Sequence, residues 1–334
     1  MPSNDLLIIA AHEVEAALLG LETQVLDAVR KAYQAHARGA SSLPHSSFLR
    51  FPDSEKDRII CLPAYLGGEE PLAGVKWIAS MPGNVARGME RASAVIILND
   101  RLSGRPKAII EGSIISKQRT AASAALASKV LAPAEPEAIG FVGCGPINAA
   151  IAQFLATAWP NVSRMIAFDL DPARAEAFAK TAGTLKPGVD VEVAPNLESL
   201  LSECPLVAFA TTATTPYLDS LDACPAGATI LHISLRDLGV NAILSNHNIV
   251  DDLDHVNRAA TSIHLASEQE GQTVFVHSSL GDILLGKADL PERDDRKLIF
   301  TPFGLGVLDL AVANLVMKTL AAEGGGTRIK SFLP

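Results

Sequence analysis

A glycine turn between a short apolar run and an alanine-rich segment constrains this chain most. Residues 138–142 predict a buried strand, Gly143 and Gly145 follow it directly, and residues 147–158 favour a helix. A strand, a glycine turn and a helix in this order open the βαβ unit that binds dinucleotides. Gly143 would allow the tight turn. Gly145 would let the backbone approach a pyrophosphate, whose charge the N-terminus of the following helix favours.

The residues after the turn refine this prediction. Pro146 suits the first helical turn, where its missing N–H costs nothing. Asn148 stands where the motif normally has a third small residue. Asp169 ends the next predicted strand, roughly twenty residues beyond the glycines, where an acid binds ribose hydroxyls. That acid favours NAD over NADP because it would repel a 2′-phosphate. Arg174 lies nearby and leaves NADP open, although it could equally be a solvated surface residue.

Length, charge and cysteine content exclude several classes of protein. The 334 residues predict two domains. The net charge of −9 argues against partners such as nucleic acid or an anionic membrane surface. No apolar run is long enough to span a membrane, and the first residues do not resemble a signal peptide, so we expect a cytoplasmic protein. The four cysteines lack zinc-ligand spacing, so we predict free thiols and no metal site.

Two patterns of periodicity predict two domains. The first part predicts a helix and a mostly antiparallel sheet: a helix at 22–38 and strands at 47–51, 58–62, 73–78, 93–98 and 106–110. A helix predicted at 112–131 connects the first domain to the second. Strands then alternate with helices: strands at 138–142, 164–168, 189–193, 206–210, 228–233 and 248–251, and helices at 147–158, 172–182 and 196–203. This alternation indicates an α/β fold with a Rossmann-type doubly wound parallel sheet.

A last helix at 307–322 could return to pack on the first domain. We therefore predict an N-terminal α+β domain of residues 1–118 completed by 307–334, and a Rossmann domain of residues 119–306. A flexible joint is expected at 324–326, where three glycines follow one another.

Ligands of doubly wound sheets bind beyond the carboxyl ends of the strands. This rule selects Thr211 with Thr212, residues 234–237, and Asp251 with Asp252. Asp237 follows an apolar strand, and a carboxylate there could act as general base towards a water or an amine. The alternative is that Asp237 caps the N-terminus of a helix at 238–240.

Several cations interrupt apolar segments of the first domain. Lys76 and Arg119 lie within such segments, Arg50 alternates with aromatic residues, and Arg58 and Arg91 open strands. A buried charge is costly unless it is paired. A substrate carboxylate or a pyrophosphate could be the partner, and arginine offers two-pronged geometry for either. Structural ion pairs, for example with Glu90 or Glu111, are the alternative.

Motifs along nearly the whole chain resemble the ornithine cyclodeaminase/μ-crystallin family. The matching segments are Val75-Lys76-Trp77, residues 118–123, Gly143-x-Gly145, Phe168-Asp169, residues 171–174, residues 210–212, residues 250–252 and Gly304-x-Gly306. The resemblance implies an enzyme that acts on an amino acid as a homodimer. The N-terminal domain, completed by the last helix, would supply the dimer interface and the substrate site, and the Rossmann domain would hold NAD(H).

Within the family, longer segments resemble the branch that makes 2,3-diaminopropionate for siderophores or peptide products. These segments are residues 57–63, 67–69 and 89–100. The implied reaction is NAD-dependent oxidative hydrolysis of N-(2-amino-2-carboxyethyl)-L-glutamate to 2,3-diaminopropionate and 2-oxoglutarate. Cyclodeaminases of the family carry a Glu just before the proline of the second strand, where this chain has Leu62. Ornithine cyclodeaminase, alanine dehydrogenase and a non-catalytic dinucleotide-binding protein remain alternatives.

The resemblance also implies roles for individual residues. Asp237 would be the catalytic acid, and Arg50, Lys76, Arg91 and Arg119 would bind the substrate. The cofactor site would comprise Gly143, Gly145, Pro146, Ile147, Asn148, Asp169, Thr211, His232, Ile233 and Ser234, of which the last three would line the nicotinamide.

Overall fold

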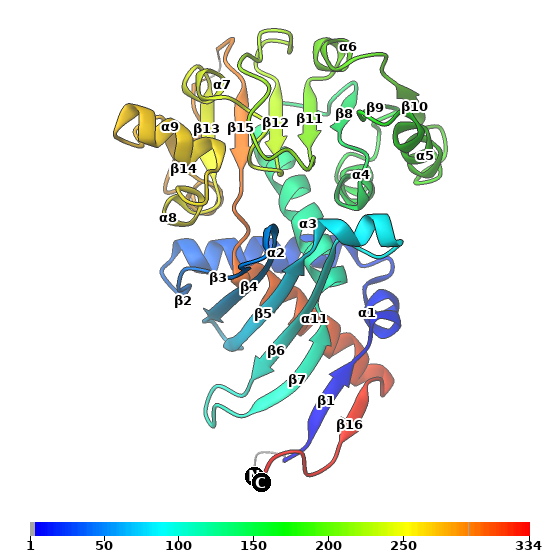
Figure 1. The fold of residues 1–334 in the computed structure, drawn as a ribbon, viewed down its shortest axis with the longest axis vertical. Helices are drawn as coiled ribbons and strands as arrows, with labels where there is room; N and C mark the ends of the chain where they lie inside the picture. Colours follow the sequence, from blue (N-terminus) through cyan, green and yellow to red (C-terminus); the bar gives the residue numbers. More distant parts are fainter. Residues whose placement is uncertain (1–3, 293) are drawn as a thin grey trace. The chain divides into compact units, whose positions relative to one another are not determined.

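A computed structural model describes residues 4–292 and 294–334. The chain divides into two compact units (Figure 1). Unit 1 comprises Met1–Arg119 and Leu305–Pro334, and unit 2 comprises Thr120–Gly304. The division falls within helix α3 (Ser113–Leu131), which starts in unit 1 and continues in unit 2. The predicted α/β fold class is confirmed, because unit 2 contains a parallel sheet flanked by helices.

Unit 1 is a mixed sheet with helices packed against it. Its strands are β1 (Leu6–Ile9), β2 (Ser41–Ser42), β3 (Ser47–Phe51), β4 (Ser54–Leu66), β5 (Leu72–Ser80), β6 (Ala92–Asn99), β7 (Pro106–Glu111) and β16 (Thr327–Ile329). Their order is β16-β1-β7-β6-β5-β4-β2, with β3 also paired to β4. Besides the start of α3, the helices are α1 (Ala11–Leu18), α2 (Glu22–Ala37), the short 3-10 helix η1 (Pro82–Arg87) and α11 (Gly306–Glu323).

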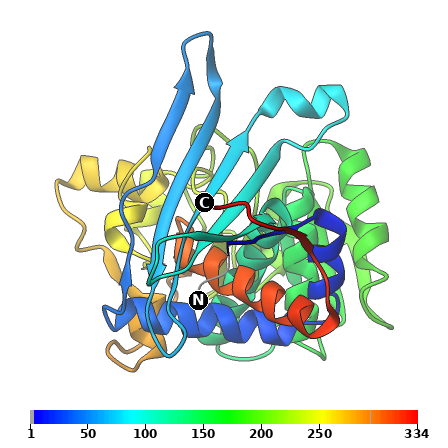
Figure 2. The ribbon, with the colours of Figure 1, turned by 90° about the horizontal axis from the view of Figure 1, so that it is seen from below.

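The five strands and the long helix predicted in this region are all present. Helix α11 packs on β4 and β5 and runs beside α2, as Figure 2 shows, so the last helix does return to the first part of the chain. Three strands are not predicted from the sequence: β1, the two-residue β2 and β16. β1 pairs parallel with β7, and β16 pairs antiparallel with β1, so the chain beyond Gly326 continues as an edge strand after the expected joint.

Unit 2 is a doubly wound sheet in which every pairing between described strands is parallel. Its strands are β8 (Ile139–Val142), β9 (Arg164–Phe168), β10 (Asp190–Val193), β11 (Leu206–Phe209), β12 (Thr229–His232), β13 (His247–Val250), β14 (Val276–Ser279) and β15 (Leu298–Thr301). Their order is β10-β9-β8-β11-β12-β15-β13-β14. The chain reverses direction across the sheet between β8 and β11, which is where such sheets bind ligands.

Helices cover the faces of this sheet. They are α4 (Pro146–Ala158), α5 (Pro172–Ala182), α6 (Leu197–Glu203), α7 (Val240–Leu244), α8 (Leu253–Val256), α9 (Ser262–Glu270) and α10 (Leu280–Leu284). The six predicted strands and three predicted helices are confirmed within one or two residues. The sequence prediction missed β14 and β15. β15 lies between a charged segment and Pro302, so its flanks resemble a loop.

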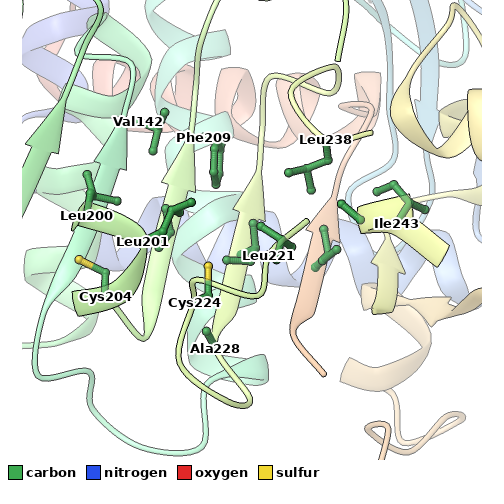
Figure 3. Close-up of a cluster of buried hydrophobic side chains, with 14 of the residues drawn as sticks. Val142, Leu200, Leu201, Cys204, Phe209, Leu221, Cys224, Ala228, Leu238 and Ile243 are labelled. Carbon is green, nitrogen blue, oxygen red and sulfur yellow. The ribbon is translucent and has the colours of Figure 1, made fainter. Parts of the chain in front are cut away.

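The core of unit 2 lies between the sheet and the helices on one face. Figure 3 shows Phe209 of β11 and Leu200 of α6 within this buried cluster, with Leu238 and Ile243 farther along it. All four side chains are fully buried, so they fix the sheet that carries the loops described below. Among residues 4–292 and 294–334, no helix combines the length and apolar character needed to cross a bilayer.

Candidate active site

The glycine turn at the end of β8 requires its first glycine. Gly143 has a φ of +85°, and a Cβ there would lie 2.8 Å from the carbonyl oxygen of Ala210. Both the backbone conformation and the space therefore exclude a side chain. Gly145 differs, because a Cβ there would meet no heavy atom within 4 Å. The predicted tight turn is confirmed, and helix α4 begins at Pro146 as expected.

The hydrogen bonds of Asn148 explain why this residue replaces the third small residue of the glycine motif. Its side chain is fully buried, and Nδ2 donates to the carbonyl oxygens of Val142, at 3.0 Å, and Gly143, at 2.7 Å. A third bond, of 3.3 Å, reaches the carbonyl oxygen of Ala208 in β11. Asn148 thus ties the turn to both neighbouring strands from within helix α4. A larger residue is accommodated here because its amide satisfies three backbone acceptors.

The carboxylate of Asp169, the residue after β9, binds the backbone of the same turn. It accepts the backbone N–H of Cys144 at 2.7 Å and that of Asp171 at 3.0 Å, and it is half-buried. The positive φ at Gly143, the open space at Gly145, the start of α4 and this acid together fit a dinucleotide. Arg174 lies on the exposed surface, with Nε 3.8 Å from Asp171.

The two glycines make a matched pair of variants. Gly143→Ala should lower the free energy of unfolding by about 1–3 kcal/mol, because it forces a side chain into a left-handed conformation against the Ala210 carbonyl. Gly145→Ala should cost less than about 1 kcal/mol. It should instead weaken NAD binding, because its methyl group enters the open space. Denaturant unfolding and NAD titration separate the two effects, and equal losses of stability would contradict this assignment.

Asp237 lies in the turn after β12 and is completely buried. Its Oδ1 accepts hydrogen bonds from the Thr211 hydroxyl and, at 3.0 Å, from the Tyr217 hydroxyl, and its Oδ2 accepts from Ser234. Its backbone N–H donates to His232 Nε2 at 3.1 Å. Burial raises the pKa of Asp237, but the contacts with His232, Ser234 and Thr211 lower it by more. The pKa therefore lies below its usual value, and Asp237 is a carboxylate at neutral pH.

The turn that carries Asp237 is strained. Leu235 has a φ of +73°, a conformation that bulky residues rarely adopt, and such outliers collect at functional sites. Helix α7 begins three residues later and its N-cap is Gly239, so the interpretation of Asp237 as a helix cap is wrong. The turn thus holds one buried carboxylate among three hydroxyl donors. Three of the residues predicted to bind the cofactor contact Asp237: Thr211, His232 and Ser234. Two others, Ile147 and Ile233, are half-buried.

A second buried charge cluster lies in unit 1. The Nζ of Lys76, on β5, is 2.8 Å from Oδ2 of Asp309 on α11, and the Nε of Arg119 donates to Oδ1 of Asp309 at 3.0 Å. Lys76 also donates to the Ser116 hydroxyl at 3.0 Å. Lys76 and Asp309 are buried completely, or nearly so. Two cations facing one carboxylate leave a net positive charge, which favours an anionic ligand.

The sequence prediction expected a partner for these cations but missed Asp309. The proposed partner Glu111 instead accepts hydrogen bonds from Ser113 and Ile114 at the start of α3. The criterion that selected Lys76, a charge inside an apolar segment, also applies to Asp309 in Val307-Leu308-Asp309-Leu310. Asp309 resembles an ordinary acid in the first turn of a helix, where it stabilises the helix dipole, which is why it was overlooked.

Arg50 and Arg91 lie farther along the same sheet, outside this cluster. Arg50 is exposed, and its guanidinium is 5.6 Å from the centre of the Phe48 ring. Arg91 donates to the Ser80 hydroxyl at 3.4 Å. No described carboxylate forms a salt bridge with either arginine.

Asp251 and Asp252 serve a structural purpose. Asp251 is buried and accepts the backbone N–H groups of Phe303, at 2.9 Å, and Gly304, at 2.7 Å, so it fixes the loop after β15. Asp252 caps helix α8. The expectation that these acids face a ligand is therefore wrong. Among the residues that the structure describes, no group of three or more His, Cys, Asp or Glu could hold a metal ion.

The chain belongs to the ornithine cyclodeaminase/mu-crystallin family, whose model matches residues 5–324. It is 30% identical to N-((2S)-2-amino-2-carboxyethyl)-L-glutamate dehydrogenase of Staphylococcus aureus, over 99% of this chain and 100% of that one. The crystal structure of CmnK has a TM-score of 0.89 and 28% identity, over 98% of this chain and 99% of that chain. An archaeal alanine dehydrogenase dimer with bound NAD has a TM-score of 0.88 and 28% identity, over the same shares.

Proposed function

We propose that this protein is an NAD-dependent dehydrogenase that cleaves N-(2-amino-2-carboxyethyl)-L-glutamate to 2,3-diaminopropionate and 2-oxoglutarate. The observation that carries the proposal is the buried cluster of Lys76, Arg119 and Asp309, whose net positive charge suits a substrate carboxylate. The full-length similarity to the Staphylococcus aureus dehydrogenase supports the choice of substrate. Its product would enter siderophore or peptide assembly. The free cysteines fit a reducing cytoplasm.

In this proposal, unit 1 binds the substrate and unit 2 binds the cofactor. When bound, NAD⁺ accepts hydride from the Cα of the glutamate moiety. Lys76 and Arg119 hold the α-carboxylate attached to that carbon, and Arg50 and Arg91 contact another carboxylate. Oxidation of the C–N bond gives an imine, which takes up water. Asp237 would receive a proton of that water through one of the hydroxyls that it binds, and would return it to the nitrogen. Collapse of the adduct then breaks the C–N bond, the carbinol hydroxyl becomes the ketone of 2-oxoglutarate, and the protonated nitrogen leaves as the amine of 2,3-diaminopropionate.

Leu62, which lies beside Lys76, helps to distinguish the proposed reaction from that of a cyclodeaminase. Leu62 lies directly opposite Lys76 in the β4–β5 register, at the position where cyclodeaminases are expected to carry Glu. An apolar residue there cannot bind the second amine of ornithine. Alanine dehydrogenase is the stronger alternative, because an enzyme of that name has the same fold with bound NAD.

Absorbance at the NADH wavelength tests the proposal directly. Purified protein with NAD⁺ is mixed in separate samples with the tricarboxylate substrate, alanine and ornithine. NADH formation with the first alone, accompanied by 2-oxoglutarate, is the expected result. NADH from alanine alone would replace the proposal with alanine dehydrogenase, and ammonia from ornithine without net NADH would indicate a cyclodeaminase. Cofactor binding without turnover on any of the three would favour a non-catalytic protein.

Lys76 should make substrate affinity depend on pH. The pKa of Lys76 lies at about 8, because burial and the nearby Arg119 lower it by more than Asp309 raises it. The ammonium group is therefore present below about pH 8 and lost above it. We expect KM to rise roughly 10- to 100-fold through this range, because a charged hydrogen bond to the carboxylate disappears. Lys76→Ala should have a high KM that no longer changes there, and a wild-type KM that is constant from pH 7 to 9.5 would contradict this role.

We also propose a homodimer formed through the sheet of unit 1. Trp77 is 42% exposed, and in register it lies between Cys61 and Val95 on the face opposite Lys76. Partly exposed apolar residues of neighbouring strands share this face, which suits a second copy of the chain. The alanine dehydrogenase of the same fold is a dimer. The mass in solution tests this proposal, with Trp77→Glu expected to shift dimer towards monomer.

A further inference from the structure

The loop after β11 is bonded to the turn that carries Asp237. The backbone N–H groups of Tyr217 and Leu218 both donate to the carbonyl oxygen of Asp237 at 3.0 Å. Gly239 donates to the carbonyl oxygen of Leu218 at 2.8 Å, and Leu218 forms a parallel bridge with Leu238. The loop follows β11 and the turn follows β12, two neighbouring strands in Figure 1. This backbone pairing fixes Tyr217 beside the buried acid.

The side chain of Tyr217 contacts Asp237 as well. Its hydroxyl donates to Oδ1 at 3.0 Å, although Tyr217 is 50% exposed and Asp237 is completely buried. Burial and the nearby carboxylate raise the pKa of Tyr217 well above its usual value. The hydroxyl therefore keeps its proton at neutral pH. Tyr217 thus joins a buried carboxylate to the surface of unit 2.

The other polar partners of the carboxylate have more enclosed surroundings. Thr211 and Ser234 are half-buried, and the Thr211 hydroxyl also accepts the backbone N–H of Ala213 at 3.1 Å. His232 is completely buried, with Nε2 at 3.4 Å from Oδ2 of Asp237. Among these contacts, the hydroxyl of Tyr217 offers a proton on Asp237 the most direct path to solvent.

Oxidation of an amine by NAD⁺ and water releases a proton. The hydrogen on Cα leaves as hydride to the cofactor, and the oxygen of water becomes the ketone oxygen. A protonated secondary amine carries two hydrogens on nitrogen and water brings two more, whereas the ammonium group of the product keeps three. One proton therefore leaves in each turnover. A buried acid that takes part in these transfers needs a neighbouring group that carries this proton away.

We propose that Tyr217 relays this proton from Asp237 to solvent. The phenol oxygen accepts the proton of the Asp237 carboxyl while its own proton passes to a water molecule, and the hydroxyl then rotates back to its bond with Oδ1. Thr211 and Ser234 remain for the transfer from the attacking water. The inference rests on the proposed role of Asp237 but not on the choice of substrate, because oxidation of alanine releases the same proton.

Tyr217→Phe tests the relay, because it keeps the ring and removes only the hydroxyl. In weak buffer kcat should fall about 10-fold, which is less than the loss expected when the acid itself is removed. Imidazole added at constant pH and ionic strength should restore most of the wild-type kcat, because a water in place of the hydroxyl can pass the proton to this base. The wild-type kcat should not respond to imidazole. Tyr65→Phe, the same change on β4, should retain the wild-type kcat in every buffer.

Two results would overturn the relay. One is a wild-type kcat for Tyr217→Phe in weak buffer, and the other is a loss that imidazole does not restore, which would leave the hydroxyl as a structural contact. Failure of the proposed function gives a different pattern. NADH from alanine alone would change the substrate, and the same comparison would then be made with alanine. A wild-type protein that turns over none of the substrates would overturn both proposals.

Discussion

The Asp237→Asn variant should lose about 100- to 10,000-fold in kcat, the usual contribution of a positioned acid or base. The amide has the shape of the carboxylate, and the surrounding hydroxyls can rotate to donate to its oxygen or accept from its nitrogen. The turn should therefore keep its structure. What the variant lacks is a group that accepts a proton, so KM should change less than about threefold while kcat falls.

Steady-state kinetics with the tricarboxylate substrate provide the measurement. Asp219→Asn is the matched control, because Asp219 lies in the same region of unit 2 but is exposed. Its carboxylate accepts a hydrogen bond of 3.3 Å from the Asn241 amide. This control should retain its kcat. Tyr217→Phe removes one hydrogen-bond donor from Asp237 and leaves the carboxylate in place, so its loss should be smaller. An undiminished kcat in Asp237→Asn would remove Asp237 from the mechanism.

The Asp309→Asn variant should be about 3–5 kcal/mol less stable to unfolding at pH 7, because two buried cations then lose their shared counter-ion. Loss of the carboxylate should also depress the pKa of Lys76 below its present value of about 8. Lys76 in the variant then releases its proton at a lower pH than in the wild type. The stability deficit should therefore be largest at pH 6 and shrink as the pH approaches 8.

Denaturant unfolding at pH 6, 7, 8 and 9 measures this effect. The control is Asp254→Asn, which removes an exposed pair with Arg258 at 3.2 Å and should cost less than about 1 kcal/mol at every pH. Combining Asp309→Asn with Lys76→Met should recover part of the lost stability, because only one buried cation remains. A deficit that does not vary with pH would mean that the charge of Lys76 does not depend on Asp309.

Local sequence patterns predicted most helices and strands. The features that they did not predict depend on contacts between residues far apart in the sequence. The strand at 138–142, its turn and its helix follow from glycine chemistry and periodicity within a few residues. Lys76 was found because a charge inside an apolar strand is anomalous locally. Its partner, Asp309, lies near the other end of the sequence, and no local signal links the two. β15 shows the same limit, since its place between β12 and β13 depends on partners distant in sequence.

The candidate site was also predicted only in part: the sequence indicated the positions of its residues but not their contacts. The sequence indicated that Asp237 follows an apolar strand, but it could not reveal the three hydroxyls that surround the carboxylate. Asp251 had an equally good position at a strand end, yet it binds backbone N–H groups. Only the fold distinguishes the two acids, because the difference lies in which loop each one meets. Asn148 likewise looked like a defect in the motif until its three backbone acceptors were visible.

The placement of Asp309 has a consequence for synthesis of the protein on the ribosome. All strands of unit 2 emerge before α11 and β16, so that unit can complete its sheet while translation continues. The sheet of unit 1 starts to form first, but its edge strand β1 lacks β16, and Lys76 lacks its counter-ion, until the last part of the chain is released. The nascent enzyme should therefore finish its second unit before its first, and a chain stalled before residue 306 would expose an incomplete sheet that chaperones and proteases can recognise.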